Sequence, residues 1–249
     1  MDITGKTALI TGAASGIGLA AAHQLVQRRI GRLMLADLNE AAFKHIRQDL
    51  KTEENQEIEC RRVDVSKVGE IAGLYDRLNS RFGAPDIVFN CAGIVTGAPG
   101  FPDVSVEHIA KVISVNLVSA AVSTKLAVDA MKASGGGVIV NMGSTGAFNP
   151  NLPQAPYSAA KAGIVMLSQS CKALQGEYGI RVNALCPGIT ETAILDATGD
   201  GQRPDWLLEL MKSKKIWTAQ EMAEQFVLIC EDDSMAGEYR VFENPELPK

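Results

Sequence analysis

A tyrosine and a lysine stand four residues apart in the stretch QAPYSAAKAG, residues 154–163. Residues four apart lie on one face of a helix, so the ammonium group of Lys161 would stand near the phenol of Tyr157. A free phenol titrates near ~10, and a neighbouring cation favours its charged form and lowers that pKa. The pair could therefore act as a general base, although the same spacing also occurs in ordinary amphipathic helices.

A glycine-rich stretch near the start of the chain, TGAASGIG at residues 11–18, could hold a phosphate group. Gly12, Gly16 and Gly18 would let the backbone turn tightly, approach a pyrophosphate and pack closely against a helix whose N-terminus faces the anion. Asp37 follows at about the spacing from which a carboxylate accepts hydrogen bonds from an adenosine ribose. A packing turn and a helix cap are the structural alternatives for these residues.

The elements that must position these residues alternate along the chain. Short apolar runs end in polar or glycine residues, as buried parallel strands do, and segments of helical length lie between them. This alternation predicts an α/β fold, a single Rossmann-type doubly wound parallel sheet with helices on both faces, formed by residues 1–249 as one domain. Residues 190–217 break the rhythm and are expected to form helices over a mouth of the sheet. The expected strands are 6–11, 32–37, 58–65, 86–93, 137–144 and 181–188, and the expected helices are 16–29, 40–54, 68–82, 104–133 and 157–178.

Composition excludes several classes of function. The chain has 249 residues, 46% of them hydrophobic, and a formal net charge of -5, which argues against a nucleic-acid partner. No stretch approaches the ~20 apolar residues of a membrane span, and the start lacks the pattern of a signal peptide, so a cytoplasmic protein without a membrane partner is expected. Five cysteines form no CxxC pair or metal-like cluster, and the three histidines lie beside no plausible ligand, so no metal is expected.

Several motifs together resemble the short-chain dehydrogenase/reductase family, in that family's order, over residues 5–192. They are TGAASGIG, Asp64-Val65, NCAG at 90–93, Asn116 in VNLVS, Ser144, YSAAK and PGITET from 187. Within the family, CPGITETAIL at 186–195, Gln154 and EDDSMAG near the end are most similar to the 15-hydroxyprostaglandin dehydrogenase branch.

The resemblance implies a catalytic tetrad of Asn116, Ser144, Tyr157 and Lys161. Tyr157 would take the proton of a substrate alcohol while hydride leaves the same carbon for a nicotinamide cofactor. Lys161 would lower the pKa of Tyr157 and bind the nicotinamide ribose, Ser144 would hold the substrate oxygen, and Asn116 would anchor a water. Gln154 would face the substrate beside Ser144, although a surface glutamine before a turn is the competing interpretation.

The resemblance also implies the cofactor site. Asp37 would bind the ribose of NAD, and because Ser15 and Leu38 stand where NADP-binding relatives usually carry a basic residue, NAD is the expected cofactor. Thr190 and Thr192 would reach the pyrophosphate or carboxamide, or would cap the next helix. The implied contacts are Gly12, Ser15, Gly16, Ile17, Gly18, Asp37, Leu38, Asp64, Val65, Asn90, Ala92, Gly93, Tyr157, Lys161, Pro187, Gly188, Ile189, Thr190 and Thr192.

Two departures from the family pattern bear on these expectations. Cys91 stands where the family usually has a second asparagine, and the C-terminal EYRVFENPELPK is polar where many relatives end in a glycine-rich strand. The main hypothesis is an NAD-dependent dehydrogenase of a lipophilic secondary alcohol; a biosynthetic reductase and a cofactor-binding sensor without turnover are the alternatives. A homodimer or homotetramer is expected from the family and from small residues in 104–133 and 157–178, with packing inside one subunit as the competing interpretation.

Overall fold

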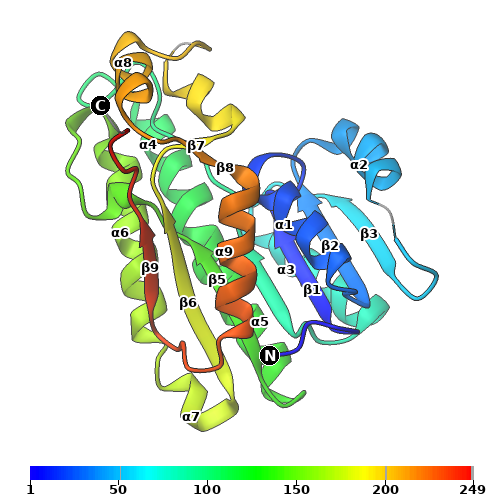
Figure 1. Ribbon diagram of the computed structural model, residues 1–249. Coiled ribbons are helices and arrows are strands. Elements are labelled where there is room, and N and C mark those ends of the chain that lie inside the picture. The colour runs from blue at the N-terminus through cyan, green and yellow to red at the C-terminus, as the bar shows by residue number, and fades with distance from the viewer. Residues whose placement is uncertain (51, 200, 248–249) are drawn as a thin grey trace.

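The computed structural model describes residues 1–50, 52–199 and 201–247, which form a doubly wound parallel sheet flanked by helices (Figure 1). The main sheet has the order β3-β2-β1-β4-β5-β6-β9, and all of its pairs are parallel. This confirms the fold class predicted from the alternating pattern. Its strands are β1 (Thr7–Thr11), β2 (Arg32–Asp37), β3 (Glu57–Arg62), β4 (Ile87–Asn90), β5 (Gly137–Met142), β6 (Ile180–Pro187) and β9 (Tyr239–Phe242).

Two helical layers cover the sheet, so its central strands are buried on both faces. In β1, Ala8 and Ile10 pack with helices α1 and α9, whereas Leu9 packs with α3 and α5 on the opposite face. A stack of Phe89 on Phe226, with ring centroids 4.1 Å apart, joins β4 to α9. The helices are α1 (Gly16–Gln27), α2 (Phe43–Asp49), α3 (Val68–Phe82), α4 (Val106–Ile113), α5 (Ser119–Lys132), α6 (Ala155–Ser170), α7 (Leu174–Tyr178), α8 (Asp205–Ser213) and α9 (Ala219–Glu231).

Some expected helices differ in extent from those in the structure. The helix expected over 40–54 begins with a short 3-10 helix, η1 (Glu40–Ala42), and ends at Asp49, after which Leu50 is extended; residue 51 lies outside the described residues. The helix expected over 157–178 begins earlier, at Ala155, and is interrupted after Ser170 before α7.

The run from Val106 to Lys132 is long and apolar enough to cross a membrane by length and composition, which the sequence analysis did not anticipate. Half of its most apolar window is buried in the fold. There α5 packs against α3 and α6, as a core helix does. A five-residue π-helical turn, η2 (Ser114–Val118), separates α4 from α5 within this run.

The segment from 190 to 217 contains a 3-10 helix, η5 (Ala193–Thr198), and α8, and its two ends are paired. The two-residue strands β7 (Thr190–Glu191) and β8 (Trp217–Thr218) lie parallel to each other as a second small sheet. We call residues 190–217 the lid segment. Figure 1 shows it at the end of the molecule where the parallel strands have their carboxyl ends.

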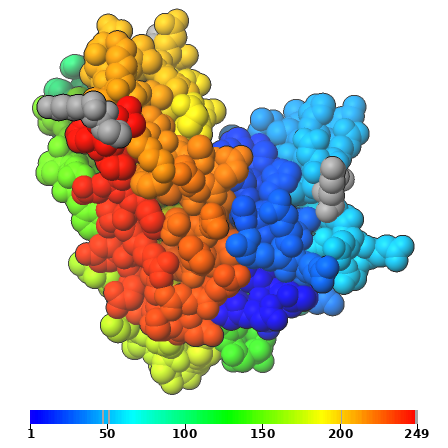
Figure 2. Space-filling model, in the orientation of Figure 1, coloured from blue at the N-terminus to red at the C-terminus, as the bar shows by residue number. Residues whose placement is uncertain are grey.

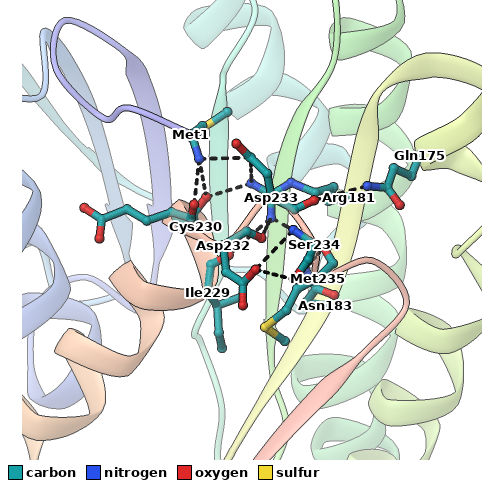
Figure 3. A network of polar contacts seen from close by, with 11 residues as sticks. Met1, Gln175, Arg181, Asn183, Ile229, Cys230, Asp232, Asp233, Ser234 and Met235 are labelled. Atoms are coloured by element: carbon teal, nitrogen blue, oxygen red, sulfur yellow. Dashed lines mark hydrogen bonds and ion pairs between the residues drawn. The ribbon is translucent and has the colours of Figure 1, made fainter.

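A buried arginine fastens the far end of α9 to the sheet (Figure 3). Arg181, on β6, is 5% exposed, and its guanidinium pairs with the carboxylate of Asp233 at 3.2 Å. An arginine at a helix C-terminus satisfies carbonyl groups that have no partner inside the helix. Arg181 donates hydrogen bonds to the main-chain oxygens of Ile229, Cys230, Asp232 and Met235.

Replacing Arg181 with methionine is expected to lower the free energy of unfolding by about 2–4 kcal/mol, because four main-chain carbonyl groups lose a charged donor and Asp233 loses its ion pair. Urea denaturation of the purified variant measures this change. Arg61→Met is the matched control, since Arg61 is half-exposed and its nearest carboxylate, of Glu59, is 3.9 Å away; we expect a change within about 0.5 kcal/mol there. Equal effects in the two variants would contradict the capping role.

Candidate active site

A cavity of about 960 Å³ lies at the carboxyl ends of the strands, between β1 and β4, where the chain leaves to opposite faces of the sheet. Figure 2 shows the molecule notched at this end, between the yellow and orange lid segment and the blue N-terminal part. The cavity brings together nearly all residues predicted from the sequence: Gly12, Ser15, Gly16, Ile17, Gly18, Asp37, Leu38, Asp64, Val65, Ala92, Gly93, Ser144, Gln154, Tyr157, Lys161, Pro187, Gly188, Ile189, Thr190 and Thr192.

The glycine loop joins β1 to α1 and has no room for side chains at two points. A Cβ atom on Gly12, whose φ is +68°, would lie 2.7 Å from the backbone of Ala92, and one on Gly18 would lie 2.1 Å from the carbonyl oxygen of Gly12. The amides at the start of α1 have no partner inside the helix, and the Ser15 side chain does not cap them. The close backbone and the N-terminus of α1 therefore fit an anionic phosphate group.

Asp37 ends β2 at the opposite side of this loop. Its Oδ2 accepts a hydrogen bond from the amide of Ala14 at 2.9 Å, and its Oδ1 accepts one from the amide of Asn39 at 2.9 Å. These bonds hold the carboxylate at the cavity wall, and each oxygen keeps a second lone pair for another donor. Leu38, beside it, is 57% exposed.

Asp64 also lines the cavity, but its side chain is occupied by a turn. Its Oδ1 accepts hydrogen bonds from the amide of Ser66 at 3.1 Å and from the Ser66 hydroxyl at 2.6 Å. The hydroxyl bond is the main reason that the pKa of Asp64 lies below its usual value.

Ser144, Tyr157 and Lys161 meet at the centre of the cavity. Ser144 follows β5 and caps the 3-10 helix η3 (Thr145–Ala147), accepting a hydrogen bond from the amide of Gly146 at 3.0 Å. A Cβ atom on Gly146 would lie 3.4 Å from both Ser144 Oγ and the Tyr157 ring, so the two side chains converge there. The ammonium of Lys161 lies 5.6 Å from the centroid of the Tyr157 ring.

The charges in this cluster differ from the sequence expectation. Burial raises the pKa of the Tyr157 phenol, and a hydrogen bond with Ser144 opposes that rise. Lys161 does not lower it here, because its ammonium donates to the carbonyl of Met142 at 2.7 Å and faces the ring rather than the phenol oxygen. Burial lowers the pKa of Lys161 to about 8.

Asn116 and Asn90, both predicted to serve the site, lie beneath the cavity and are not among the residues that line it. Asn116 lies in the π-helical turn, and its amide donates to the carbonyls of Ile94 at 2.7 Å and Val112 at 2.9 Å, while its Oδ1 accepts from the Ile94 amide. Asn90 donates to Asn141 Oδ1 at 2.8 Å across β4 and β5. Both side chains brace the floor of the cavity through backbone and strand contacts.

The two threonines of PGITET do not cap the following helix. The Thr190 hydroxyl donates to the carbonyl of Gly188 at 3.2 Å, and the Thr192 hydroxyl donates to that of Thr190 at 3.2 Å. Thr192 stands at the N-cap of η5 without a capping bond from its side chain. Both threonines therefore bond back into their own turn at the cavity wall.

Cys91, the departure from the family pattern, lines the cavity beside the glycine loop. The amide of Gly18 hydrogen-bonds its thiol, and burial raises the pKa of that thiol to about 12. Cys91 is therefore a neutral, hydrogen-bonded thiol at neutral pH.

The lid segment supplies an apolar wall that sequence reasoning did not identify. Leu207 anchors α8 with 1% exposure, whereas Trp206 next to it is 53% exposed. The three-residue spacing of Leu207 and Leu210 on a short amphipathic helix was the available signal. The lid residues on this wall are Ile194, Leu195, Trp206, Leu207 and Leu210.

The C-terminal segment holds the base of the lid, and this role was also not predicted. Asn244 donates to the carbonyls of Ile189 at 2.8 Å and Lys215 at 2.9 Å, and its Oδ1 accepts from the Ile189 amide. The Trp217 indole donates to the carbonyls of Phe242 and Glu243, each at 3.1 Å. The polar C-terminus is therefore a brace between β9 and both ends of the lid segment.

Comparison with known proteins agrees with this geometry. Residues 6–203 match the family model for short chain dehydrogenases. The chain belongs to the short-chain dehydrogenase family. It is therefore an oxidoreductase of that family.

Relatives of this short-chain dehydrogenase act on varied molecules. This chain is 30% identical to human 15-hydroxyprostaglandin dehydrogenase [NAD(+)] over 250 residues, and the match covers 95% of this chain and 90% of that protein. It is 34% identical to 3beta-hydroxysteroid dehydrogenase 2 of Eggerthella lenta, covering 77% of this chain and 74% of the relative. The crystal structure of levodione reductase superposes with a TM-score of 0.88 at 26% identity, covering 97% of each chain.

Proposed function

We propose that this short-chain dehydrogenase is an NAD-dependent oxidoreductase that interconverts a lipophilic secondary alcohol and its ketone, with Tyr157 as the general base. The observation that carries the proposal is the convergence of Ser144, Tyr157 and Lys161 in one cavity. That cavity has a phosphate-binding glycine loop on one side and the apolar lid wall among its other walls. The Ser144 hydroxyl hydrogen-bonds the Tyr157 phenol, so the two groups are close enough to meet one substrate oxygen.

Each residue of the cluster has a separate task in the proposed reaction. Ser144 donates a hydrogen bond to the substrate oxygen and keeps it beside the phenol, and Tyr157, as phenolate, takes the hydroxyl proton. With a cofactor bound, the Lys161 ammonium would hold the nicotinamide ribose and, on turning from the Met142 carbonyl toward the phenol, would favour the phenolate. Asn116 fixes the turn behind Lys161. When bound, the nicotinamide would accept hydride from the carbon that carries the hydroxyl.

Two features support NAD as the cofactor. The Asp37 carboxylate stands at the cavity wall within reach of the loop amides, where a ribose hydroxyl would donate to it and a 2'-phosphate would be repelled. The human relative carries NAD(+) in its name. The apolar lid wall and the relative named for a hydroxysteroid support a lipophilic substrate.

Incubation of the purified protein with a panel of secondary alcohols and NAD tests the proposal, with the absorbance of reduced nicotinamide as the readout. Oxidation of lipophilic members is expected. A protein that binds the cofactor but neither oxidises any alcohol of the panel nor reduces the matching ketones would instead be the cofactor-binding sensor.

Replacing Lys161 with methionine is expected to raise the free energy of unfolding at pH 7 by about 1–2 kcal/mol while lowering turnover, because a buried charge is removed. The pKa of Lys161 is about 8 in the fold against 10.5 when unperturbed, so the unfolded chain binds more protons between those values. The desolvation cost is fully present below pH 8 and is relieved as pH rises toward 10.5.

The stability difference between Lys161→Met and the wild type should therefore shrink between pH 7 and pH 9 in urea titrations. Lys125→Met, which removes an exposed lysine on α5, is the control and should show little pH dependence. A Lys161→Met variant less stable than the wild type at pH 7 would contradict this assignment.

We further propose a homodimer or homotetramer, built through α5 and α6. Exposed apolar side chains support an interface between copies, since Met166 on α6 is 62% exposed and Val118, in η2 just before α5, is 38% exposed. Light scattering at micromolar concentration should give at least twice the subunit mass.

A cytoplasmic location likewise stays a prediction.

A further inference from the structure

A second cavity, of about 460 Å³, adjoins the first on the side of the lid segment. The two cavities share four residues at their junction: Asn151, Gln154, Thr198 and Trp206. The remaining walls of the second cavity are Gly97, Ala98, Gly100, Pro153, Gly199 and Pro204. We call this space the side lobe; its volume lies in the ~300–1,000 Å³ range of small-molecule sites.

Defined contacts hold the walls of the side lobe together. The amide of Thr96 donates to Gln154 Oε1 at 3.0 Å, and the amide of Phe101 donates to the carbonyl of Pro153 at 3.1 Å. These bonds fasten the loop after β4 to the start of α6. Gly97 packs on the lid segment, since a Cβ atom there would lie 2.9 Å from the carbonyl oxygen of Ala197.

The lobe wall has a chemical character different from that of the glycine loop. Among the described residues that line it, none carries a charge, and several are apolar or lack a polar side chain. Trp206 lines both the lobe and the main cavity and is 53% exposed. An indole with about half of its surface in water gains free energy when an apolar group covers it.

Resting on the proposed function, we infer that the side lobe holds the uncharged, apolar tail of an elongated substrate whose hydroxyl lies between Ser144 and Tyr157. Trp206 and Ala98 then set the preferred length of that tail. A short alcohol would occupy the main cavity alone and leave the lobe to water. The substrate class is therefore an extended lipophilic secondary alcohol rather than a small or highly charged one.

Steady-state oxidation of butan-2-ol, hexan-2-ol, octan-2-ol and decan-2-ol with NAD tests this inference. We expect kcat/KM to rise about two- to fourfold with each added methylene, because each buries further apolar surface. A wild-type enzyme that oxidises these alcohols without any rise along the series would overturn the role of the lobe and leave the proposed function standing.

Two variants locate the effect. Ala98→Leu narrows the lobe, and Trp206→Ala removes the side chain that lines both cavities. The readout is the ratio of kcat/KM for decan-2-ol to kcat/KM for butan-2-ol. Each variant should lower this ratio at least about tenfold, because several methylene contacts are lost. Ala173→Leu makes the same change as the first variant on the exposed surface before α7 and should keep the wild-type ratio. An unchanged ratio in both lobe variants would contradict the inference.

Binding provides a readout that does not depend on turnover. The fluorescence of Trp206 is obtained by subtracting the signal of the Trp206→Phe variant. In the wild type it should change saturably as decan-2-ol is added. In Ala98→Leu the dissociation constant for decan-2-ol should be at least about tenfold higher. If no alcohol is oxidised but this binding is seen, the proposed function fails and the lobe assignment holds. If decan-2-ol leaves the Trp206 signal unchanged, the lobe assignment fails.

Discussion

Replacing Tyr157 with phenylalanine is expected to lower kcat for alcohol oxidation by about 10²–10⁴, because the change removes the proton acceptor and keeps the ring. The half-buried phenol hydrogen-bonds Ser144, and the Lys161 ammonium lies over the ring, so the variant should fold and retain the cavity. Steady-state kinetics with a lipophilic alcohol measures the loss, and titration of the cofactor checks that binding is kept.

Tyr178→Phe is the control, because Tyr178 lies on α7, outside the residues that line the cavity, with Lys132 over its ring. Its activity should match that of the wild type. Wild-type turnover in Tyr157→Phe would remove Tyr157 from proton transfer.

Replacing Asp37 with serine and Leu38 with arginine is expected to narrow or invert the preference for NAD over NADP. A carboxylate that accepts hydrogen bonds from a ribose would repel a 2'-phosphate, and an arginine at position 38 would pair with it. Lost hydrogen bonding and repulsion together correspond to about 2–4 kcal/mol, or roughly 30- to 1000-fold in kcat/KM. Ratios of kcat/KM for the two cofactors measure the change and cancel any general loss of activity.

The double variant Asp129→Ser with Leu228→Arg makes the same chemical changes on α5 and α9, at residues that do not line the cavity. It should leave the cofactor ratio as in the wild type. Equal efficiency of the wild-type enzyme with NAD and NADP would contradict the placement of Asp37 at the ribose.

The strands that could be predicted from the sequence are mainly those whose apolar residues follow one another without interruption. The inner strands β1, β2, β4, β5 and β6 are near-continuous apolar segments because helices cover both of their faces. β9 was not predicted because it is the edge strand, and Tyr239 at its start and Val241 remain about 40% exposed in a polar context. β3, the other edge strand, was predicted although it too is partly exposed, because it falls in its place in the alternation of strands and helices.

The candidate site was predictable where residue type and position in a motif carry the chemistry. Gly12, Gly18 and Asp37 stand at strand ends, and parallel strands bring their carboxyl ends to one edge. A motif does not show which way a side chain points or which group it bonds. Asn90 turns into the sheet toward Asn141, and Lys161 bonds the Met142 carbonyl, because of neighbours that are distant in sequence.

The lid wall and the side lobe were not predictable for a related reason. They form only when the loop after β4, the start of α6 and the lid segment meet, through contacts such as Thr96 with Gln154 and Gly97 with Ala197. Their residues have no shared spacing in the sequence. Their apolar character became evident only once these segments were placed together.

Isotope transfer tests the central claim most directly. The purified enzyme is incubated with NAD and a lipophilic secondary alcohol that carries deuterium on the carbon bearing the hydroxyl, and the reduced cofactor is examined by mass spectrometry. The account predicts one deuterium per reduced cofactor with the wild type and almost no labelled cofactor with Tyr157→Phe. Reduced cofactor without deuterium, or equal labelling by the two proteins, would contradict it.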